Sequence, residues 1–501
     1  MAKEHPDLYK NVIKGSFWIF ALRISTQLLS MLRLVILARL LAPEDFGLLG
    51  IALLLMSILQ TFTATGVDAA LIQKQKDITP YLNTAWTLKV VRGFAIYALL
   101  FFAAPLAAGL KMSPEQVETA VLIIRVTGLS LIIDGFVNIG TIYFSKELQF
   151  DKNFTMGTVS NLCSMLISIA IAVVYKNPWA LVAGKLINSL SGTILSYMMH
   201  VYRPRFSFSF HKAAELWKFG RWITAGSIMS FVITEGDDCL VLYTLGPQAL
   251  GLYQMAYRVS NSPATEITGL LSKITFPAYS LISGDKERLS KAFLKTISYT
   301  ALLGFPIGVG IFVMAESFIR TFLGDRWLPI VIPVQLLTIV GMMGTVFANN
   351  MACFQALNKA KMMTMVHIVR VILMYAMIYP LTIKYGIIGT SLAVLIPAVA
   401  VKFINVPMIL NVFNMRLAEF FDALKCQLFC SFAAGAALYL LDSMRQAKDL
   451  KADPFSAVYF IFCSLIGAII YFGLILVFDR NRNAYKEPVK MLIRKGLGFV
   501  R

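Results

Sequence analysis

The stretch LLAPEDFGLLGIA at residues 40–52 returns in altered form as TLGPQALGLYQMA at residues 244–256. One constant shift aligns four residues of the two stretches: Pro43 with Pro247, Gly47 with Gly251, Leu48 with Leu252 and Ala52 with Ala256. The same shift also pairs residues upstream of them, Lys14 with Lys218 and Trp18 with Trp222. Apolar sequences match one another by chance, but matched tryptophan, proline and glycine at one shift indicate an internal repeat.

The chain around the two copies has the composition of a membrane protein. Of its 501 residues, 58% are hydrophobic and 15% are charged. A soluble globular chain carries about 25% charged residues. Because a span needs about 20 mostly apolar residues, the sequence predicts an all-α polytopic membrane protein with about fourteen transmembrane helices. The approximate limits are 15–41, 46–72, 82–110, 116–144, 154–175, 178–201, 217–245, 248–282, 292–315, 329–356, 362–383, 386–412, 421–441 and 455–478.

The place of the two copies in this series predicts the domain organisation. About six spans separate them, so both copies enter the membrane in the same orientation. We expect two six-helix lobes, residues 1–202 and 203–412, in a pseudo-twofold repeat about an axis along the membrane normal. Residues 413–501 then add two extra helices and a basic tail. Parallel repeats of this kind build transporters, with the substrate path between the lobes and alternating access by rocking.

The distribution of lysine and arginine predicts the orientation. These residues are concentrated in alternate loops, and cytoplasmic loops carry the excess of positive charge. Both termini are therefore expected in the cytoplasm. The first apolar run, residues 17–41, is too long for the core of a cleavable signal, and we interpret it as the first span. The tail at 484–501 alternates basic and apolar residues, which is typical of a surface helix on anionic lipid.

Several functional classes do not fit this sequence. The loops between the expected spans are too short for a soluble catalytic domain, which argues against an enzyme such as a membrane glycosyltransferase or a saccharide polymerase. The six cysteines lie in apolar stretches without a CxxC pair or a histidine cluster, so neither disulfides, a metal site nor a cofactor is expected. The net charge of +19 is spread along the chain and does not form a folded basic domain, so no nucleic-acid partner is expected.

Two longer segments resemble a known family. The segment LARLLAPEDFGLLGIALLLMSILQTFTATGVDAALIQ, residues 37–73, is similar to the first-loop signature of the bacterial polysaccharide-transporter family. These are the Wzx-type flippases of the multidrug/oligosaccharidyl-lipid/polysaccharide exporter superfamily. The stretch LGPQALGLYQMAYRVSNSPATEITGLLSKITFPAYS, residues 245–280, resembles the matching signature of the second lobe. Within the family the chain looks most like the colanic-acid and teichuronic-acid exporter branch, although Asp68 stands where relatives more often have a small or apolar residue.

The resemblance implies a fold, a substrate and a location. It implies a fourteen-helix flippase for an undecaprenyl-pyrophosphate-linked oligosaccharide repeat unit, which serves exopolysaccharide, O-antigen or capsule synthesis. The location would be the bacterial cytoplasmic (inner) membrane. The partners would be the lipid-linked substrate and the membrane lipids, with a polysaccharide polymerase and export machinery as further candidates.

Basic residues inside the expected spans predict a wet, charged interior. A charge at mid-bilayer costs about 2.5 to 3.5 kcal/mol, so it usually faces a partner or an aqueous cavity. A pyrophosphate needs cations, and a cationic lumen would offset the hydration that the anion loses. The candidate lumen cations are Arg23, Arg33, Arg258, Lys273 and Arg370. The alternatives are snorkelling near span ends, as for Lys89, Arg92 and Lys185, and structural ion pairs with carboxylates.

Acidic and amide residues form the second set of candidates. Glu235 and Asp238 are three apart on one expected helix and would share a face, and with Glu266 they are candidates for proton or sodium coupling. Pairing with lysine or arginine near the outer interface is the alternative. Asn349 and Asn350 are among the amides that could bond to sugar, although packing explains most such positions.

Two other transport functions stay open at this point. A flippase for the peptidoglycan lipid precursor would also bind a pyrophosphate-linked saccharide. A cation-coupled drug exporter would share the two lobes, but the basic interior fits an anionic lipid carrier better. The paired signatures favour the exopolysaccharide branch.

Overall fold

The computed structural model describes residues 22, 25–74, 77–109, 112, 114–147, 149–446 and 455–478, and this part of the chain is helical, without strands. The predicted all-α class is confirmed. The described chain packs as two compact units, which we describe one at a time. The lobe boundaries expected from the repeat stay a prediction, because shared packing and sequence repetition define a domain by different criteria.

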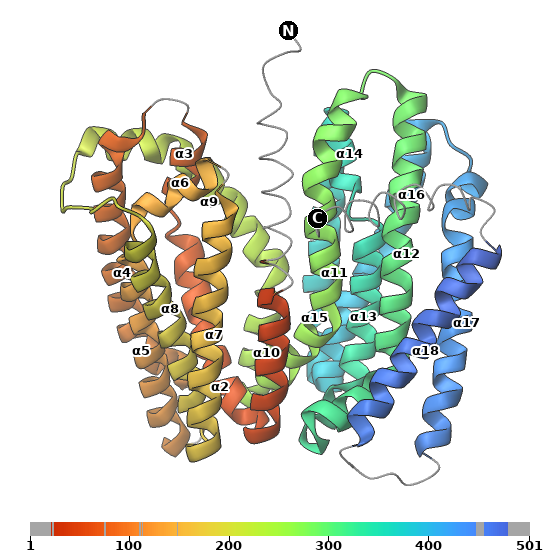
Figure 1. Ribbon diagram of the computed structural model, residues 1–501, viewed down its shortest axis with the longest axis horizontal. Coiled ribbons are helices and arrows are strands. Elements are labelled where there is room, and N and C mark those ends of the chain that lie inside the picture. The colour runs from red at the N-terminus through yellow and green to blue at the C-terminus, as the bar shows by residue number, and fades with distance from the viewer. Residues whose placement is uncertain are drawn as a thin grey trace, which may run out of the picture. The chain divides into compact units, whose positions relative to one another are not determined.

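The first unit comprises Met1–Met255, Leu323–Ile330 and Tyr375–Ala393. After a helix at residues 25–40, its elements are α2 (Pro43–Phe62), α3 (Val67–Gln73), α4 (Thr79–Ala108), α5 (Pro114–Gly135), η1 (Ile139–Thr141), α6 (Ile142–Lys146), α7 (Phe150–Tyr175), α8 (Trp179–Met199), α9 (Phe210–Thr234) and α10 (Gly236–Leu245). The start of α11 (Pro247–Leu281), η3 (Asp325–Ile330) and the middle of α15 (Ala360–Ala400) complete it. Figure 1 shows α4, α5, α7 and α8 side by side, and α5 contacts both α4 and α8.

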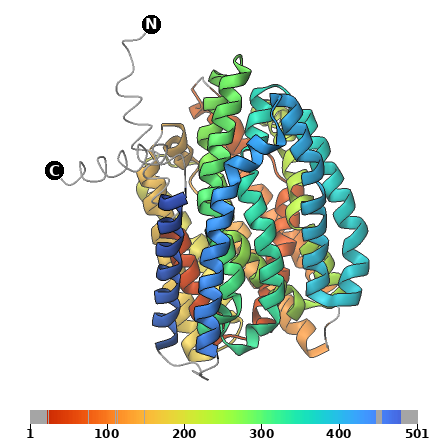
Figure 2. The same cartoon turned by 90° about the vertical axis from the view of Figure 1, so that its right-hand side faces the viewer.

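The second unit comprises Ala256–Phe322, Val331–Met374 and Val394–Arg501. It contains most of α11, α12 (Lys286–Phe318), the first part of η2 (Ile319–Leu323), α13 (Val331–Val346), α14 (Asn350–Ala356), both ends of α15, α16 (Lys402–Phe413), α17 (Leu417–Gln446) and α18 (Phe455–Phe478). α12 contacts α13, α17 and α18. Figure 2 shows the two blue C-terminal helices running next to each other.

Nine helical stretches in the described part are long and apolar enough to cross a membrane. One of them, Lys361–Phe413, covers two of the predicted spans. The predicted spans at 178–201, 217–245 and 248–282 are also helical. α11 has 35 residues, which is about 52 Å at 1.5 Å per residue, so it is longer than a bilayer core of about 30 Å requires. The count of fourteen stays a prediction.

Local sequence explains where the helices begin. Pro43 occupies the first turn of α2, where its missing N–H costs nothing, and the Asp45 carboxylate accepts a hydrogen bond from the Ala42 N–H at 2.9 Å. Asp285 caps α12 by accepting from the Arg288 N–H at 3.0 Å. Both helices therefore have a defined start, set by side chains that bind the first backbone donors.

The two repeat stretches pack against each other within the first unit. A Cβ on Gly47 would collide with the Pro247 carbonyl oxygen, and a Cβ on Gly251 would collide with the Pro43 carbonyl oxygen. The Gln248 amide donates to the Glu44 carboxylate, two positions that are 204 residues apart in sequence. Because each copy presents the same contact to the other, the packing is reciprocal, as at a twofold axis.

The end of one predicted span and the start of the next meet at Gly386. This residue has φ 60, a left-handed conformation that glycine adopts without a steric cost, so the chain reverses there inside α15. A Cβ on Gly389 would collide with the Leu381 carbonyl oxygen. The buried hydroxyls of Thr382 and Thr390 lie 2.9 Å apart and join the two arms. The predicted boundary between residues 383 and 386 is therefore correct.

The predicted span at 46–72 is interrupted instead. Gly66 separates α2 from α3 in a left-handed conformation with φ 62. It lies against α9, where a Cβ on Gly66 would lie 2.6 Å from the Cα of Gly220. The span expected at 46–72 thus consists of two helices. The chain leaves the helical conformation at Gly66, where it packs closely against Gly220.

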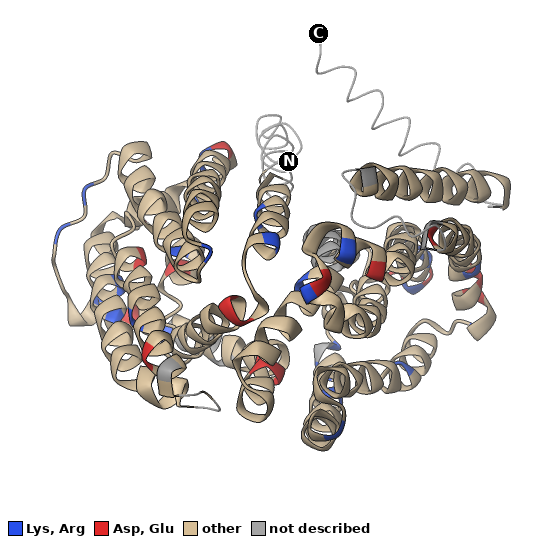
Figure 3. Ribbon diagram, turned by 90° about the horizontal axis from the view of Figure 1, so that it is seen from below, with Lys and Arg blue, Asp and Glu red and all other residues tan. Residues whose placement is uncertain are grey.

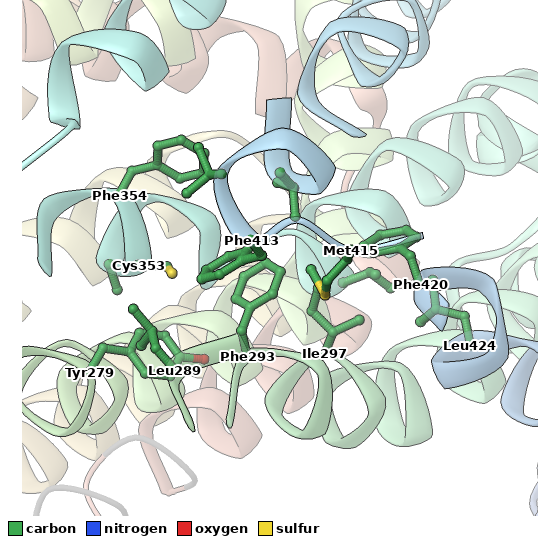
Figure 4. Packing of buried hydrophobic residues seen from close by; sticks show 14 of the residues in the cluster. Tyr279, Leu289, Phe293, Ile297, Cys353, Phe354, Phe413, Met415, Phe420 and Leu424 are labelled. Atoms are coloured by element: carbon green, nitrogen blue, oxygen red, sulfur yellow. The ribbon is translucent and has the colours of Figure 1, made fainter. Parts of the chain in front are cut away.

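A large apolar cluster holds the second unit together. Figure 4 shows Phe293 of α12 against Phe413 of α16, with ring centroids 5.3 Å apart, and Cys353 and Phe354 of α14 nearby. Phe420 and Leu424 of α17 belong to the same cluster. α12, α14, α16 and α17 are therefore fixed relative to one another by buried side chains.

Candidate functional site

The structure describes most, but not all, of the predicted site residues. Arg23 lies outside the described residues. Glu266 and Lys273 lie on α11, but their side chains are not among those described. The remaining candidates are Arg33, Arg258, Arg370, Glu235 and Asp238. Figure 3 shows that charged positions are a minority on the ribbon and lie among the helices.

Arg33 is half-buried and is held against α7. Its Nη1 donates to the Ser164 hydroxyl at 2.6 Å, and Ser164 in turn donates to the Gly184 carbonyl of α8 at 2.6 Å. Ser160, Ser164 and Ser168 are nearly fully buried at four-residue intervals and form a polar stripe on α7. The Arg33 guanidinium is therefore oriented in part by a chain of hydroxyl hydrogen bonds that runs from α7 to α8. Arg258 of α11 is exposed.

Arg370 faces the packed side of α15. It is half-buried and lies four residues from Val366 and from Met374, which are 5% and 3% exposed, so all three share one helix stripe. It is close enough to interact electrostatically with His367 and with Lys402 of α16. Lys402 Nζ lies 4.1 Å from the ring centroid of Phe347, a cation–π contact.

The charges of Arg370 and Lys402 are not offset by a carboxylate among the described residues. In the part of the chain that the structure describes, neither Arg370 nor Lys402 forms an ion pair with a carboxylate. Like charges brought together inside a protein repel one another, and the repulsion is normally offset by an anion. The sequence analysis selected Arg370 but did not select His367 or Lys402 for the site.

Buried amides lie on the neighbouring elements. Between α13 and α14 the helix is interrupted at residues 347–349, and Asn349 and Asn350 follow Phe347. Asn349 accepts from the Thr275 hydroxyl at 3.0 Å. Among the described residues, the Asn349 and Asn350 amide nitrogens, the Asn350 carbonyl oxygen and the Asn405 carbonyl oxygen have no hydrogen-bond partner. Each such buried group costs about 1 to 3 kcal/mol.

The predicted coupling carboxylates lie at a helix break. α9 ends at Thr234 and α10 begins at Gly236, and Glu235 between them has non-helical φ −125 and ψ −5. Glu235 and Asp238 therefore do not share a continuous helix face, contrary to the expectation from their spacing. The break is stabilised by Tyr375, whose hydroxyl donates to the Val232 carbonyl at 2.9 Å.

The most buried carboxylate of this break is one that the sequence analysis did not select. Asp237 is 4% exposed and accepts from the Tyr253 hydroxyl at 2.6 Å. Asp238 accepts from the Gln254 amide at 2.8 Å. The sequence signal was available, because a glycine directly before two aspartates disfavours a continuous apolar helix.

Three other intramembrane cations are engaged locally. Lys89 Nζ lies 3.2 Å from the carboxylate of Asp68, and Lys185 Nζ lies 3.6 Å from that of Asp134. Arg92 donates to the Gln60 carbonyl at 2.6 Å. The unusual Asp68 is thus explained by a nearby ammonium. Lys89 and Lys185 differ in this from Arg370 and Lys402, for which the described residues include no carboxylate partner.

Comparison with known proteins gives consistent relatives. A sequence model for the family described as "Polysaccharide biosynthesis protein" matches residues 36–333. Lipopolysaccharide biosynthesis protein WzxC of Escherichia coli (strain K12) is 26% identical over 341 residues, which is 68% of each chain. Teichuronic acid biosynthesis protein TuaB of Bacillus subtilis (strain 168) is 22% identical over 495 residues, 98% of this chain and 99% of that protein.

Solved structures share the fold. The lipid II flippase MurJ in an inward closed conformation superposes with a TM-score of 0.73 at 16% identity, covering 94% of this chain and 99% of that one. A multidrug resistance MATE family transporter of the MOP superfamily, in an inward-facing conformation, superposes with a TM-score of 0.58 at 15% identity. The match covers 79% of this chain and 98% of that chain. The chain therefore has a MurJ- and MATE-like fold.

Proposed function

Because the chain belongs to the polysaccharide biosynthesis protein family, we propose that it translocates an undecaprenyl-pyrophosphate-linked oligosaccharide repeat unit across the cytoplasmic membrane. The chain is a multi-pass membrane transporter of polysaccharide biosynthesis and not an enzyme. The observation that carries the substrate proposal is the similarity, along nearly the whole chain, to a protein named for teichuronic acid biosynthesis. The product would serve exopolysaccharide, O-antigen or capsule synthesis.

Basic side chains would bind the pyrophosphate. We assign this role to Arg33, Arg258 and Arg370, and on sequence grounds to Arg23 and Lys273. A guanidinium can donate two parallel hydrogen bonds to phosphate oxygens, and its charge offsets the hydration that the anion loses on leaving water. The support for Arg370 is that it lies beside Lys402 without a carboxylate partner among the described residues.

Carboxylates would couple transport to an ion gradient. Glu235 lies at the break between α9 and α10, beside the buried Asp237, and Asp238 follows on α10. A helix break in a transporter brings backbone and side-chain oxygens together, where a proton or sodium ion can bind. We therefore keep Glu235 and Asp238 as coupling residues, with Glu266 as a further candidate, in an alternating-access cycle.

The location and the partners follow from this function. We place the protein in the bacterial inner membrane with both termini in the cytoplasm, on the strength of its lysine and arginine distribution. Its substrate would arrive from membrane-bound enzymes that assemble the repeat unit. The polysaccharide polymerase and export machinery would take over the product on the other side.

Deletion of the gene tests the proposal. Cells lacking the protein should accumulate a lipid-linked repeat unit on the cytoplasmic leaflet and lose a surface polysaccharide, and a plasmid copy should reverse both effects. The lipid fraction is extracted and its saccharide is identified by mass spectrometry. Accumulation of the peptidoglycan precursor, or increased sensitivity to cationic drugs without a saccharide change, would overturn the proposal in favour of another transport function.

A further inference from the structure

The second unit contains charged and polar side chains that its own packing does not use. Arg370, Lys402 and His367 lie close enough for their charges to interact, and in the described part of the chain no carboxylate pairs with the first two. Asn349, Asn350 and Asn405 carry buried amide atoms that have no hydrogen-bond partner among the described residues. A folded protein usually satisfies such groups, so their occurrence together needs an explanation.

Three observations place these groups near one another. Lys402 and Asn405 are three residues apart on α16, on the same face as the fully buried Ile409. The Lys402 ammonium lies over the ring of Phe347, at 4.1 Å from the centroid, and Asn349 and Asn350 are two and three residues further along the chain. Arg370 approaches Lys402 from α15. The cations and the amides therefore occupy one region, where two interrupted helices meet.

Packing holds these elements in place independently of the polar groups. Cys353 and Phe354 of α14 and Phe413 of α16 belong to the same apolar cluster (Figure 4). Ile409 of α16, one turn after Asn405, is also in this cluster. The polar side chains are thus carried on rigid helices, as a binding site requires.

The chemistry of the groups limits what they can bind. A guanidinium and an ammonium without counter-charges favour an oxyanion. A phosphate or carboxylate only accepts hydrogen bonds, so it cannot satisfy the carbonyl oxygens of Asn350 and Asn405. A hydroxyl both donates and accepts, and therefore pairs with either end of an amide. The combination fits an oxyanion with hydroxyl groups next to it.

We propose that Arg370 and Lys402 bind an oxyanion of the saccharide substrate, while Asn349, Asn350 and Asn405 bind the sugar hydroxyls beside that oxyanion. The assignment rests on the proposed function, which supplies a saccharide as the substrate. Two parts of such a substrate have this chemistry: the pyrophosphate with the first sugar, and the carboxylate of an acidic sugar within the repeat unit.

Substitution of Asn350 separates binding from folding. If its amide serves the substrate, Asn350→Leu removes an unsatisfied buried group, so thermal stability should stay level or rise while transport falls. Asn350→Ala is the second variant, in case leucine is too large. The matched control is Asn138→Leu, because Asn138 is also fully buried but donates to the Tyr202 carbonyl and accepts from the Gly140 N–H. This control should lose stability.

Soluble probes identify the oxyanion. Purified full-length protein is titrated with inorganic pyrophosphate, methyl glucuronide or the uncharged methyl glucoside, and binding is followed by thermal shift and calorimetry. Arg370→Gln combined with Lys402→Gln should weaken binding of one charged probe about tenfold or more, as expected for loss of charge-assisted hydrogen bonds. Arg320→Gln, which breaks an exposed pair with Glu316, should change nothing. The charged probe that loses affinity shows which oxyanion of the substrate the site binds: pyrophosphate indicates the pyrophosphate group, and methyl glucuronide indicates the carboxylate of an acidic sugar.

The outcomes distinguish this inference from the proposed function. Charged probes that bind no better than methyl glucoside, or equally well to the double variant, would overturn the inference. The same holds if both Asn350→Leu and Asn350→Ala transport normally, or if both lose stability together with transport, as Asn138→Leu should. A wild-type protein that moves no lipid-linked saccharide would instead defeat the proposed function, whatever the probe titrations show.

Discussion

At the scale of single residues, the intramembrane charges fall into two groups. Lys89 and Lys185 each lie near a carboxylate, so their charge is compensated inside the protein. Arg370 and Lys402 lie near each other instead. The sequence predicted which residue types would be retained in the membrane, but it could not say which would be paired, because the partners come from other helices at distances that only the fold sets.

Arg33 and Arg258 give the first prediction. Because a guanidinium grips two phosphate oxygens and an ammonium acts as a point charge, lysine at either position should keep part of the transport and alanine nearly none. Transport is measured beside membrane levels and thermal stability. Ser164→Ala is the control for Arg33, since it removes the hydroxyl that orients the guanidinium while leaving the charge. Normal transport by both alanine variants would exclude the phosphate-binding role.

Glu235 and Asp238 give the second prediction, which concerns ion coupling. Neutralising them to Gln and Asn should abolish the dependence of transport on an imposed proton or sodium gradient, because the ion would lose its anionic ligands, while the protein stays folded. The assay is uptake into proteoliposomes with and without the gradient. Asp68→Asn serves as the matched control, because Asp68 is engaged with Lys89. An unchanged gradient dependence in the double variant would remove both residues from the coupling mechanism.

At the scale of elements, the sequence predicted helices more securely than it predicted their interruptions. Long apolar runs identify helices because the bilayer demands about 20 residues of them. The boundary near Gly386 was predicted, since one apolar run was expected to end at residue 383 and the next to begin at residue 386. The breaks at Gly66, at Glu235 and at residues 347–349 were not predicted. At these positions contacts with other helices interrupt the helix, as Gly220 does where it packs against Gly66.

Gly236→Ala tests the break between α9 and α10. The new methyl group would fall on the Tyr375 hydroxyl, and overpacking of this kind costs about 1 to 3 kcal/mol of unfolding free energy. Thermal unfolding of the purified protein measures the loss. Adding Tyr375→Phe removes the colliding oxygen and should restore part of the stability, despite the loss of the hydrogen bond to Val232. A Gly236→Ala variant as stable as the wild type would mean that the break does not depend on Tyr375.

At the scale of the whole molecule, the repeat read from the sequence has a physical counterpart. Pro43 and Gly251 meet in the same way as Pro247 and Gly47. The sequence could identify which residues of the two copies are equivalent. It could not show that the copies contact each other, because a repeat in the sequence does not determine which of its parts lie close in space. The position of the proposed substrate site was less predictable still, since Lys402 and Asn405 lie in an ordinary apolar run.

The reciprocal contact predicts a matched pair of effects. Gly47→Ala and Gly251→Ala should each lower the unfolding free energy by about 1 to 3 kcal/mol, because each methyl group meets a backbone carbonyl that cannot move aside. Since both act on one interface, the double variant should lose less than the sum of the two. Gly310→Ala, in α12 with no described atom near the new methyl group, should be neutral or stabilising. Additive losses would argue against a shared interface.

Orientation in the membrane is the last prediction. Ser283→Cys lies next to the basic residues Lys286, Arg288 and Lys291, and should react with an impermeant maleimide only after the cells are opened. A cysteine at the opposite end of α11 should react in intact cells. Gln248 is the better position for it than Gly246, which has φ 87 and would be strained by a side chain. Both variants are made in a background without native cysteines, and the reverse labelling pattern would contradict the assignment.

The turn at Gly386 also decides where this chain can carry a fusion partner. Its two arms leave no loop between them, and the Thr382 and Thr390 hydroxyls join them one turn further in. A fluorescent domain inserted there would have to part the arms and expose those hydroxyls to lipid. Gly284, exposed between α11 and α12 with no described atom near its Cβ position, sits in a turn that already extends from the helices. Reporter fusions for imaging this transporter in living cells therefore belong at residue 284.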